Sequence, residues 1–419
     1  MTSWEWGLVI LLAVSAVQQL AATVLFWFRS RPQPTPALQS ENTTLPPVTV
    51  LLPIRGFDDR LRETIRGLKN QNYPNASVLI VLDDADGTVE PLLRQELQDA
   101  ANFEIQPLVT RLTTCGLKNS AVLQATESLP AECEIVAFID SDVVPHETWL
   151  SELVAPLANH QADCTYGCRW YTIPDQKLGT IWRYVWCAAS IVSSTVRNLP
   201  WGGSLAVRRA ILDEPNLRER WTNAGCEDLP LSAHLKKTGR RLQCVTRLVM
   251  VEPSSCSLAT YRTFTSRQML WVRLYRPDAF WPASVIYLGT TIGLWGLTIA
   301  AILRMVQADW AIVGQLVGVL AIYLGLAQAL LLLIEKRVRG LIAHRMMLPK
   351  SFGFRRRAVM LAASWLTPEL IFQAVITRRI VWRGVKYDVR KPYGVRRLTH
   401  DDNRESGEPS QSMVSQRSG

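Results

Sequence analysis

The sequence predicts an α/β domain attached to a membrane by apolar segments on both of its sides. Between residues 48 and 278, short apolar runs alternate with amphipathic stretches, which is the pattern of strands and helices in an α/β fold. Long apolar segments with few charged residues precede and follow that block, and arginines and lysines gather beside them. The 419 residues are enough for two or three units of ordinary domain size.

Composition narrows the class of protein. A hydrophobic share of 48% is ordinary for a globular chain, and it excludes both a disordered protein and one made mostly of membrane helices. The net charge of +10 comes mainly from residues 336–357 and 378–397. Because these stretches border membrane segments and carry no nucleic-acid-binding motif, we expect anionic lipid head groups, and no nucleic acid, as their partners.

The cysteines give no sign of a metal site. The chain has eight of them, and none forms a CxxC pair. Cys164 and Cys168 are the nearest in sequence, but no second pair or histidine accompanies them at zinc-ligand spacing. We therefore expect reduced thiols and a reducing compartment.

The first membrane segment is predicted within residues 1–30. Its apolar stretch from Trp4 to Phe28 is long enough to cross a hydrocarbon core of about 30 Å. The stretch begins without Lys or Arg and is too long for a signal-peptide core, whereas Arg29 and Arg31 follow it directly. We therefore expect a retained anchor whose C-terminal end faces the cytosol, followed by a polar linker over residues 31–47.

Residues 48–278 are predicted to form a cytosolic domain whose strands and helices alternate. The expected elements are strands at 48–52, 78–82, 104–109 and 135–139, and helices at 61–68, 89–101, 117–128 and 229–237.

Two of these strands end in acidic residues. Asp83, Asp84 and Asp86 follow the second strand, and Asp140 and Asp142 follow the fourth. Ligands of open α/β sheets bind beyond the carboxyl ends of the strands. An Asp at a strand end is often only a turn residue or a helix cap, but two acidic strand ends favour a shared cation. We predict a divalent cation, Mn²⁺ or Mg²⁺, at Asp140 and Asp142, completed by diphosphate oxygens and water.

Three later segments carry further candidate residues. Gly202 and Gly203 allow a backbone to approach a ligand closely, or form an ordinary turn. Glu227 and Asp228 precede a predicted helix, where they serve either as a simple cap pair or as functional carboxylates. The basic and aromatic stretch 266–273 is either an interfacial helix beside the membrane or part of the site.

The C-terminal third is predicted to return to the membrane. Residues 279–334 form a hairpin of two apolar segments, and the basic loop 335–357 then lies on the cytosolic side. The segment 358–383 has arginines at both ends and Pro368 and Glu369 in its middle. It is therefore either a re-entrant hairpin or a third C-terminal crossing. Residues 384–419 form a polar tail, expected to be disordered after His400.

Taken in order, these motifs resemble the family-2 nucleotide-sugar glycosyltransferases. The acidic triplet of that family matches the cluster at 83–86, Asp140-Ser141-Asp142 and Glu227-Asp228, and its (Q/R)xxRW motif matches residues 267–271. One membrane segment before the domain and several after it narrow the resemblance to the ceramide glucosyltransferase-like branch. Other matches to that branch are residues 48–57, residues 116–119, Trp365, Glu369, Trp382 and Arg383.

The chain departs from the pattern at one position and is ambiguous at another. Leu270 stands where the fourth motif has an arginine, so the role of that arginine is either absent or shifted to Arg273. In the first acidic cluster the alignment favours Asp86 as the nucleotide contact, and Asp83 remains an alternative.

The resemblance implies a Rossmann-like A-type glycosyltransferase domain, a UDP-sugar donor (UDP-glucose above all) and a lipid hydroxyl as the acceptor. The residues implied in nucleotide-sugar binding are Pro53, Asp83, Asp86, Lys118 and Asp140. Those implied in acceptor or diphosphate contacts are Gly203, Arg267, Gln268, Trp271 and Arg273.

The chemistry follows from the residue types. Departure of a nucleoside diphosphate leaves negative charge, which a divalent cation would stabilise, and Lys118 and Arg267 could add positive charge there. The acceptor hydroxyl needs a base, for which we choose Asp228 with Glu227 beside it. A single displacement inverts the anomeric centre, so an α-linked donor would give a β-glycoside.

A lipid acceptor also agrees with a domain tied to the membrane at both ends. A group of aromatic residues supplies rings suited to an interface or, residue by residue, to a core. These are Trp170, Tyr171, Trp182, Tyr184, Trp186 and Trp201. The bacterial inner membrane is favoured because no eukaryotic retention signal is evident.

Two alternatives remain at this stage. A processive polysaccharide synthase shares the acidic motifs, but the altered fourth motif and the few spanning segments count against it. A membrane-bound scaffold with a decayed transferase domain is the other alternative, and the retained Asp140, Asp142 and Asp228 count against it.

Overall fold

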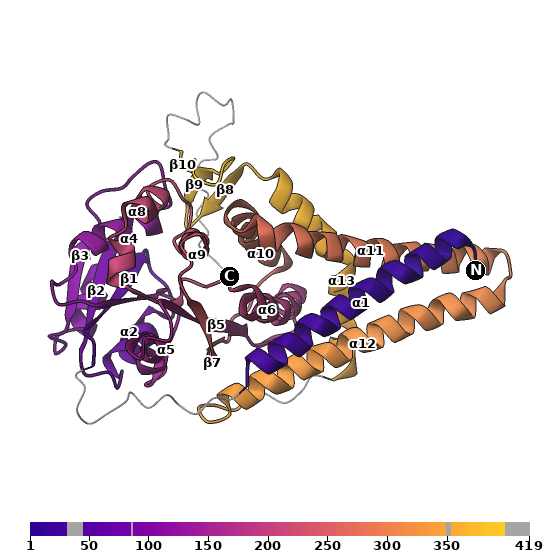
Figure 1. Ribbon diagram of the computed structural model, residues 1–419, viewed down its shortest axis with the longest axis horizontal. Helices are drawn as coiled ribbons and strands as arrows, with labels where there is room; N and C mark the ends of the chain where they lie inside the picture. The colour runs from indigo at the N-terminus through magenta and orange to yellow at the C-terminus, as the bar shows by residue number, and fades with distance from the viewer. Residues whose placement is uncertain (32–44, 85–86, 349–352, 399–419) are drawn as a thin grey trace.

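The structure is a computed structural model that describes residues 1–31, 45–84, 87–348 and 353–398. An α/β body carries an elongated arm of helices, with the N-terminus near the far end of the arm (Figure 1). The predicted linker lies mostly outside the described residues, and so does the tail expected to be disordered after His400. All eight cysteines are free, as predicted.

The body is built on a seven-stranded sheet of order β3-β2-β1-β4-β6-β5-β7. The strands from β3 to β4 are parallel, β6 is antiparallel to both of its neighbours, and β5 and β7 are parallel to each other. The strands are β1 (Val48–Arg55), β2 (Ala76–Asp83), β3 (Phe103–Pro107), β4 (Ile135–Ile139), β5 (Cys164–Tyr171), β6 (Ser204–Arg208) and β7 (Leu242–Glu252).

Helices cover both faces of this sheet. Successive side chains of a strand point to opposite faces of the sheet. Because β1, β2 and β4 are apolar at nearly every position, their side chains are buried on both faces. One face packs on α2 (Leu61–Lys69), α3 (Val89–Glu96) and α5 (Trp149–Ala158). The other face packs on α4 (Leu117–Glu127), α8 (Pro215–Trp221) and α9 (Asp228–Lys237), with the short α7 (Arg209–Leu212) beside α8.

The predicted strands and helices of the domain are present, with small shifts at their ends. The helix predicted over 89–101 stops at Glu96, because the chain turns at Leu97 to reach β3. The sequence predicted neither the strands β5, β6 and β7 nor the helix α6 (Leu178–Arg197). Polar or charged residues interrupt these elements, whereas β4 is apolar throughout.

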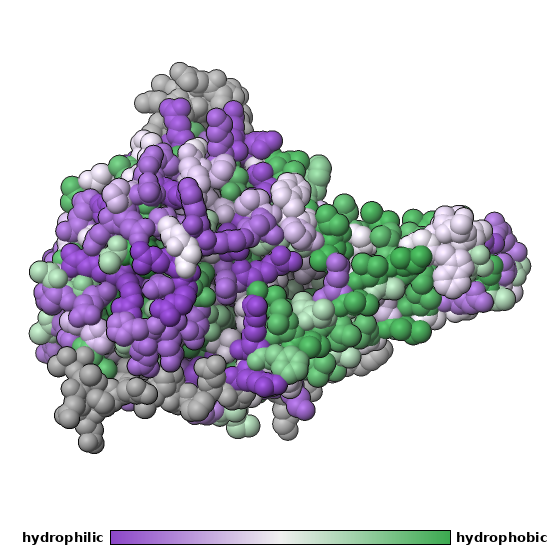
Figure 2. Space-filling view, viewed as in Figure 1, coloured by the Kyte–Doolittle hydropathy of each residue, from purple (hydrophilic) through white to green (hydrophobic). Residues whose placement is uncertain are grey.

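Three helices form the arm and are each long and apolar enough to cross a membrane. They are α1 (Ser3–Arg29), α11 (Pro277–Val306) and α12 (Trp310–Ile342). Figure 2 shows apolar residues along the arm and polar residues over most of the body. A Cβ atom on Gly293 would lie 2.7 Å from the Leu12 side chain, so the missing side chain lets α1 and α11 approach closely.

The last membrane segment of the sequence analysis forms α13 (Phe354–Ile376). Its parts Arg356–Ala363 and Pro368–Ile376 meet at a bend of 42°, and they satisfy the length and apolarity of a span only together. A proline explains a bend of this size, because its ring interrupts the helical hydrogen bonds. The helix packs against α6, α11 and α10 (Leu258–Tyr275).

A small antiparallel sheet follows α13, where the sequence analysis predicted no strand. Its strands are β8 (Arg379–Trp382), β9 (Val385–Asp388) and β10 (Arg396–Arg397). Tyr387 and Val389 pack on Leu270 and Tyr275 of α10, so the end of the described chain returns to the body, above α10 in Figure 1.

The aromatic residues assigned to an interface or a core lie mainly in the core. Trp170, Tyr171, Trp182 and Tyr184 are buried where α6 meets α12 and the end of α1. Their rings therefore join the body to the arm.

Candidate active site

A cavity of about 720 Å³ opens beyond the carboxyl ends of β1 and β4. The strand order reverses at this point, because the chain runs outward from β1 to β3 and then returns to β4 on the other side of β1. Open α/β sheets bind their ligands at such a point. Residues of α6, α10, α11 and α13 also line the cavity, so it extends from the sheet to the helices of the arm.

Asp140 and Asp142 lie directly after β4, whose five residues are all buried. Asp140 Oδ1 is 2.5 Å from Lys118 Nζ, and Asp140 Oδ2 is 3.8 Å from an Arg169 nitrogen. Burial opposes the ionisation of Asp140, but these two cations outweigh it and hold the pKa of Asp140 below its usual value. Burial and the charge of Asp140 raise the pKa of Asp142.

Lys118 joins the carboxylate of Asp140 to that of Glu227. It lies in the first turn of α4, and its Nζ is 2.6 Å from Glu227 Oε1. Burial raises the pKa of Glu227 to about 7, although Lys118 acts in the opposite direction. A Cβ atom on Gly202 would lie 1.8 Å from Glu227 Oε1. Only glycine therefore fits beside this pair.

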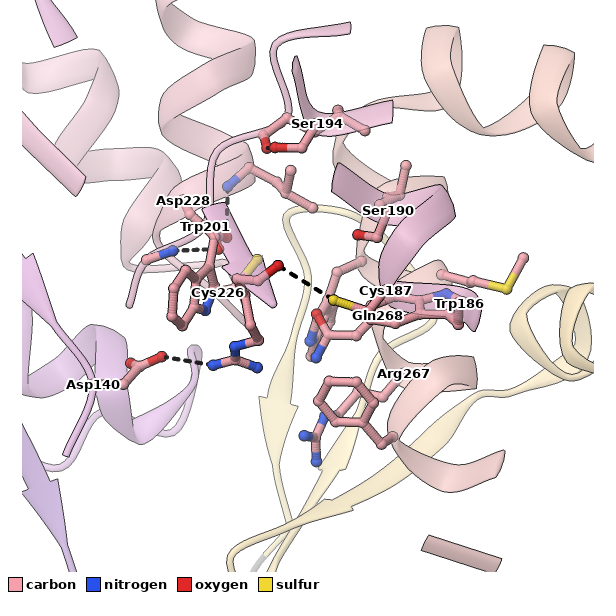
Figure 3. Close-up of a pocket in the computed structure, with 18 of the residues that line it drawn as sticks. Asp140, Trp186, Cys187, Ser190, Ser194, Trp201, Cys226, Asp228, Arg267 and Gln268 are labelled. Atoms are coloured by element: carbon pink, nitrogen blue, oxygen red, sulfur yellow. Dashed lines mark hydrogen bonds and ion pairs between the residues drawn. The ribbon is translucent and has the colours of Figure 1, made fainter. Parts of the chain in front are cut away.

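Asp228 is the first residue of α9 and lines the cavity (Figure 3). Its Oδ2 accepts a hydrogen bond from the Gly202 amide at 3.0 Å, and its Oδ1 accepts one from the Leu229 amide at 2.7 Å. The start of a helix also favours negative charge. These contacts fix the orientation of the carboxylate that the sequence analysis assigned as the base.

Arg169, in β5, is a site residue that the sequence analysis missed. Its guanidinium carbon lies 4.0 Å from the centre of the Trp201 ring, and its Nε is 2.9 Å from Glu252 Oε1. Gly203 is required here, because a Cβ atom would lie 2.2 Å from the Trp201 ring and 2.8 Å from Asp140 Oδ2. The available signal in the sequence was a single charged residue within an otherwise uncharged stretch, residues 164–171.

The first acidic cluster divides into different roles. Asp83 is buried, lines the cavity and forms ion pairs with Arg55 and with Arg111, the latter at 2.8 Å. Asp84 accepts hydrogen bonds from backbone amides at the start of α3, so it caps that helix. Asp86, favoured by alignment, lies outside the described residues.

Residues of the fourth motif lie on α10. Arg267, Gln268 and Trp271 line the cavity together with Pro53 of β1. Leu270, at the position of the expected arginine, is buried in the core between α10 and the small sheet. Arg273 is not among the residues that line the cavity, and burial lowers its pKa.

The residues at the end of β4 fit a divalent cation whose remaining coordination sites are filled by phosphate oxygens and water. Within the described residues, no group of three or more His, Cys, Asp or Glu side chains could hold a metal ion by itself. Magnesium-type ions in nucleotide sites need only one or two carboxylates, because phosphates and water complete the shell. Asp142 lines the cavity and forms no hydrogen bond or ion pair with another described residue. The donor set therefore suits such an ion.

The family model of glycosyl transferase family 21 matches residues 7–394. The chain belongs to glycosyl transferase family 21. This membership agrees with the acidic strand ends and with the predicted Rossmann-like sheet, and it makes the protein a nucleotide-sugar-dependent glycosyltransferase.

One curated relative is the glycosyltransferase AglE of Haloferax volcanii, 26% identical over 136 residues. The match covers 32% of this family 21 chain and 42% of the relative, so less than half of that protein is represented.

Several solved structures are similar at low identity. The mannosyltransferase PcManGT from Pyrobaculum calidifontis, in complex with GDP-mannose and Mn²⁺, has 16% identity and a TM-score of 0.47, and the match covers 88% of this chain and 98% of that one. The glucosyl-3-phosphoglycerate synthase of M. tuberculosis has 19% identity and a TM-score of 0.38, over 57% and 84% of the two chains. TarS of S. aureus with UDP-GlcNAc has 14% identity and a TM-score of 0.36, over 83% and 99%.

Proposed function

We propose that this family 21 protein transfers a hexose, glucose in the first place, from a UDP-sugar to the hydroxyl group of a membrane lipid with inversion. The observation that carries the proposal is the extent of the cavity. It is lined by Asp140 and Asp228 at one end and by residues of the arm helix α11 at the other.

The apolar end of the cavity supports a lipid acceptor. Phe280, Ala283 and Tyr287 lie on the first turns of α11 and line the cavity, as does Leu370 of α13. An acceptor whose apolar chains lie beside these helices would present its polar end toward Asp228. A cavity that reaches the arm therefore favours an acceptor with apolar chains over a soluble one.

The polar end suits a nucleoside diphosphate sugar. Figure 3 shows Asp140, Trp201 and Asp228 around one part of the cavity, with Arg267 and Gln268 on α10 facing another part. Lys118 and Arg169 lie within 4 Å of Asp140 and keep positive charge where the leaving group would gain negative charge. The donor UDP-glucose comes from the resemblance to the ceramide glucosyltransferase-like branch.

The mechanism proposed for these residues is a single displacement. Asp228 would accept the proton of the lipid hydroxyl as its oxygen attacks the anomeric carbon and the bond to the diphosphate breaks. The Gly202 amide would keep the carboxylate in position, through the 3.0 Å hydrogen bond that it donates. Lys118 and Arg169 would stabilise the departing diphosphate. A divalent cation held by Asp140 and Asp142 would add Lewis-acid stabilisation of the same charge.

The membrane arrangement is part of the proposal. The arm would cross the bilayer with the body on the cytosolic side, since Arg29, Arg337 and Arg339 lie at the body end of α1 and α12. At the far end, Arg304 is paired with Glu5 at 2.8 Å. The bacterial inner membrane is the proposed location, and cytosolic UDP-sugars would then reach the site directly.

The proposal is tested with purified full-length protein in lipid vesicles, labelled UDP-glucose and Mn²⁺. We expect label in a single-sugar β-linked glycolipid, detected by mass spectrometry and by the anomeric coupling in NMR. A polymer that grows without added lipid would instead indicate a processive synthase, and an α-linked product would exclude the single displacement. Comparing lipid extracts from cells with and without the gene would name the sugar and the acceptor together.

A further inference from the structure

We infer that Arg383, in the turn between β8 and β9, binds phosphate oxygens of the donor's nucleoside diphosphate. This inference rests on the proposed function, because it assumes a nucleoside diphosphate sugar in the cavity. It also addresses the missing arginine of the fourth motif, since Leu270 is buried in the core and Arg273 does not line the cavity.

The turn brings Arg383 to the site from the end of the described chain. Arg383 has a φ of 44° and Gly384 a φ of 76°, as in the tight turns that connect two antiparallel strands. Such positions favour Gly, Asn or Asp, and arginine is uncommon there. The sheet is held in place near the start of α4, where the Leu117 amide donates a hydrogen bond to the Tyr387 hydroxyl at 3.3 Å.

The guanidinium of Arg383 lies over the crevice between β1 and β4. It donates a hydrogen bond to the Arg55 carbonyl oxygen at 3.0 Å, so it touches the end of β1. Another of its nitrogens is 3.3 Å from Asp58 Oδ2 and 3.5 Å from Ser141 Oγ. Ser141 stands between Asp140 and Asp142, so the charge of Arg383 is next to the proposed metal-binding pair.

Other cations at this end of the cavity are already held by carboxylates. Lys118 lies 2.5 Å from Asp140 and 2.6 Å from Glu227, Arg169 lies 2.9 Å from Glu252, and Arg55 is paired with Asp83. Each of those cations therefore already has a carboxylate partner within the protein.

Arg383 is bound less tightly and remains accessible. Its contacts with Asp58 and Ser141 are long for charge-assisted hydrogen bonds, and its side chain is 34% exposed. It also lines the cavity. A planar guanidinium with free donors suits phosphate oxygens better than any neutral group does. Arg267, which also lines the cavity, faces the rings of Phe264 and Trp382 instead.

The test compares UDP with uridine, which lacks the phosphates. Affinities are measured by calorimetry on the full-length protein in detergent with Mn²⁺. We expect Arg383→Gln to weaken UDP binding by about 10- to 100-fold and to leave uridine binding unchanged. The UDP affinity of Arg383→Lys should lie between those of Arg383→Gln and the wild type. Arg390→Gln is the matched control, because Arg390 lies in the connection between β9 and β10, outside the cavity and paired with Asp388.

The outcomes separate this inference from the proposed function. Unchanged UDP affinity in Arg383→Gln would overturn the inference and leave the proposed donor intact. Equal losses for UDP and uridine, or a lowered melting temperature with no recovery in Arg383→Lys, would show a structural role and also overturn it. If the wild type binds GDP and not UDP, the proposed donor is wrong, and the comparison of GDP with guanosine decides the inference in the same way. A wild type that binds neither diphosphate would overturn both.

Discussion

Asp228 is the residue on which the proposed chemistry depends most directly. Its carboxylate is oriented by the amides of Gly202 and Leu229, and an asparagine would keep the shape of the side chain but could not accept a proton. We expect Asp228→Asn to lower turnover by about 10²- to 10⁴-fold with UDP affinity near that of the wild type, measured by product formation and calorimetry. Asp213→Asn, at an exposed position on the same body, is the control. Near-normal turnover in Asp228→Asn would show that Asp228 is not the general base.

Glu252 gives the site a pH-dependent contribution to stability. Burial raises its pKa from 4.5 to about 7 against the opposing effect of Arg169. The folded protein therefore holds this proton more tightly than the unfolded chain, so the contribution is complete at acidic pH and is lost as pH rises through about 7.

We expect the wild type to lose up to about 3 kcal/mol of stability relative to Glu252→Gln between pH 5 and pH 8, since a tenfold change in proton affinity corresponds to about 1.4 kcal/mol. Melting temperatures across that range measure the difference. Glu132→Gln, at an exposed position, should follow the wild type. If the melting temperature of Glu252→Gln changed with pH in parallel with that of the wild type, Glu252 would not titrate between pH 5 and pH 8.

Residue types at strand ends were predictable from sequence, whereas their partners were not. Asp140 and Asp142 line the cavity, where a buried run followed by acids marks the edge of the sheet, whereas Asp228 reaches the cavity from the start of α9. Glu252 also ends a strand, but β7 has a mixed burial pattern and so gives no comparable signal. Arg169 and Arg383 come from elements that the sequence analysis did not predict, and only the folded chain brings them to Asp140 and Ser141.

At the scale of elements, α1 and α11 pack closely against each other in the arm. A side chain at Gly293 would meet Leu12 at 2.7 Å, and overpacking of this kind costs about 1–3 kcal/mol. We expect Gly293→Leu to lower the melting temperature in detergent by several degrees. Gly314→Leu on α12, where no neighbouring atom lies within 4 Å of the added Cβ, should change it little. Equal effects of the two changes would argue against this packing.

Element predictions succeeded where hydrophobic pattern and length agreed. The arm helices and the strands β1, β2 and β4 follow from long or continuous apolar runs. The small C-terminal sheet was not predicted, because its residues were interpreted as the end of a membrane segment and a polar tail. Its short strands alternate exposed and less exposed residues, and contacts with α10 and the start of α4 define them more than their own composition does.

At the scale of the whole molecule, the cavity that spans body and arm makes a prediction about the acceptor. Ala283 lines the cavity on α11, whereas Val285, two residues later, is 69% exposed. We expect Ala283→Trp to raise the KM for the lipid acceptor and to lower turnover, with UDP affinity unchanged. Val285→Trp should behave like the wild type, because its ring would point away from the cavity. Unchanged lipid kinetics in Ala283→Trp would exclude this route for the acceptor.

The contact between Arg55 and Arg383 also bears on how the enzyme is made. These residues are 328 positions apart, and the helices α11, α12 and α13 lie between them in the chain. A ribosome has therefore translated all of these helices before the turn that carries Arg383 emerges. The proposed nucleotide crevice would therefore be completed only after the later helices have been synthesised. The proposed binding of the donor diphosphate by Arg383 would thus become possible only at that stage of synthesis.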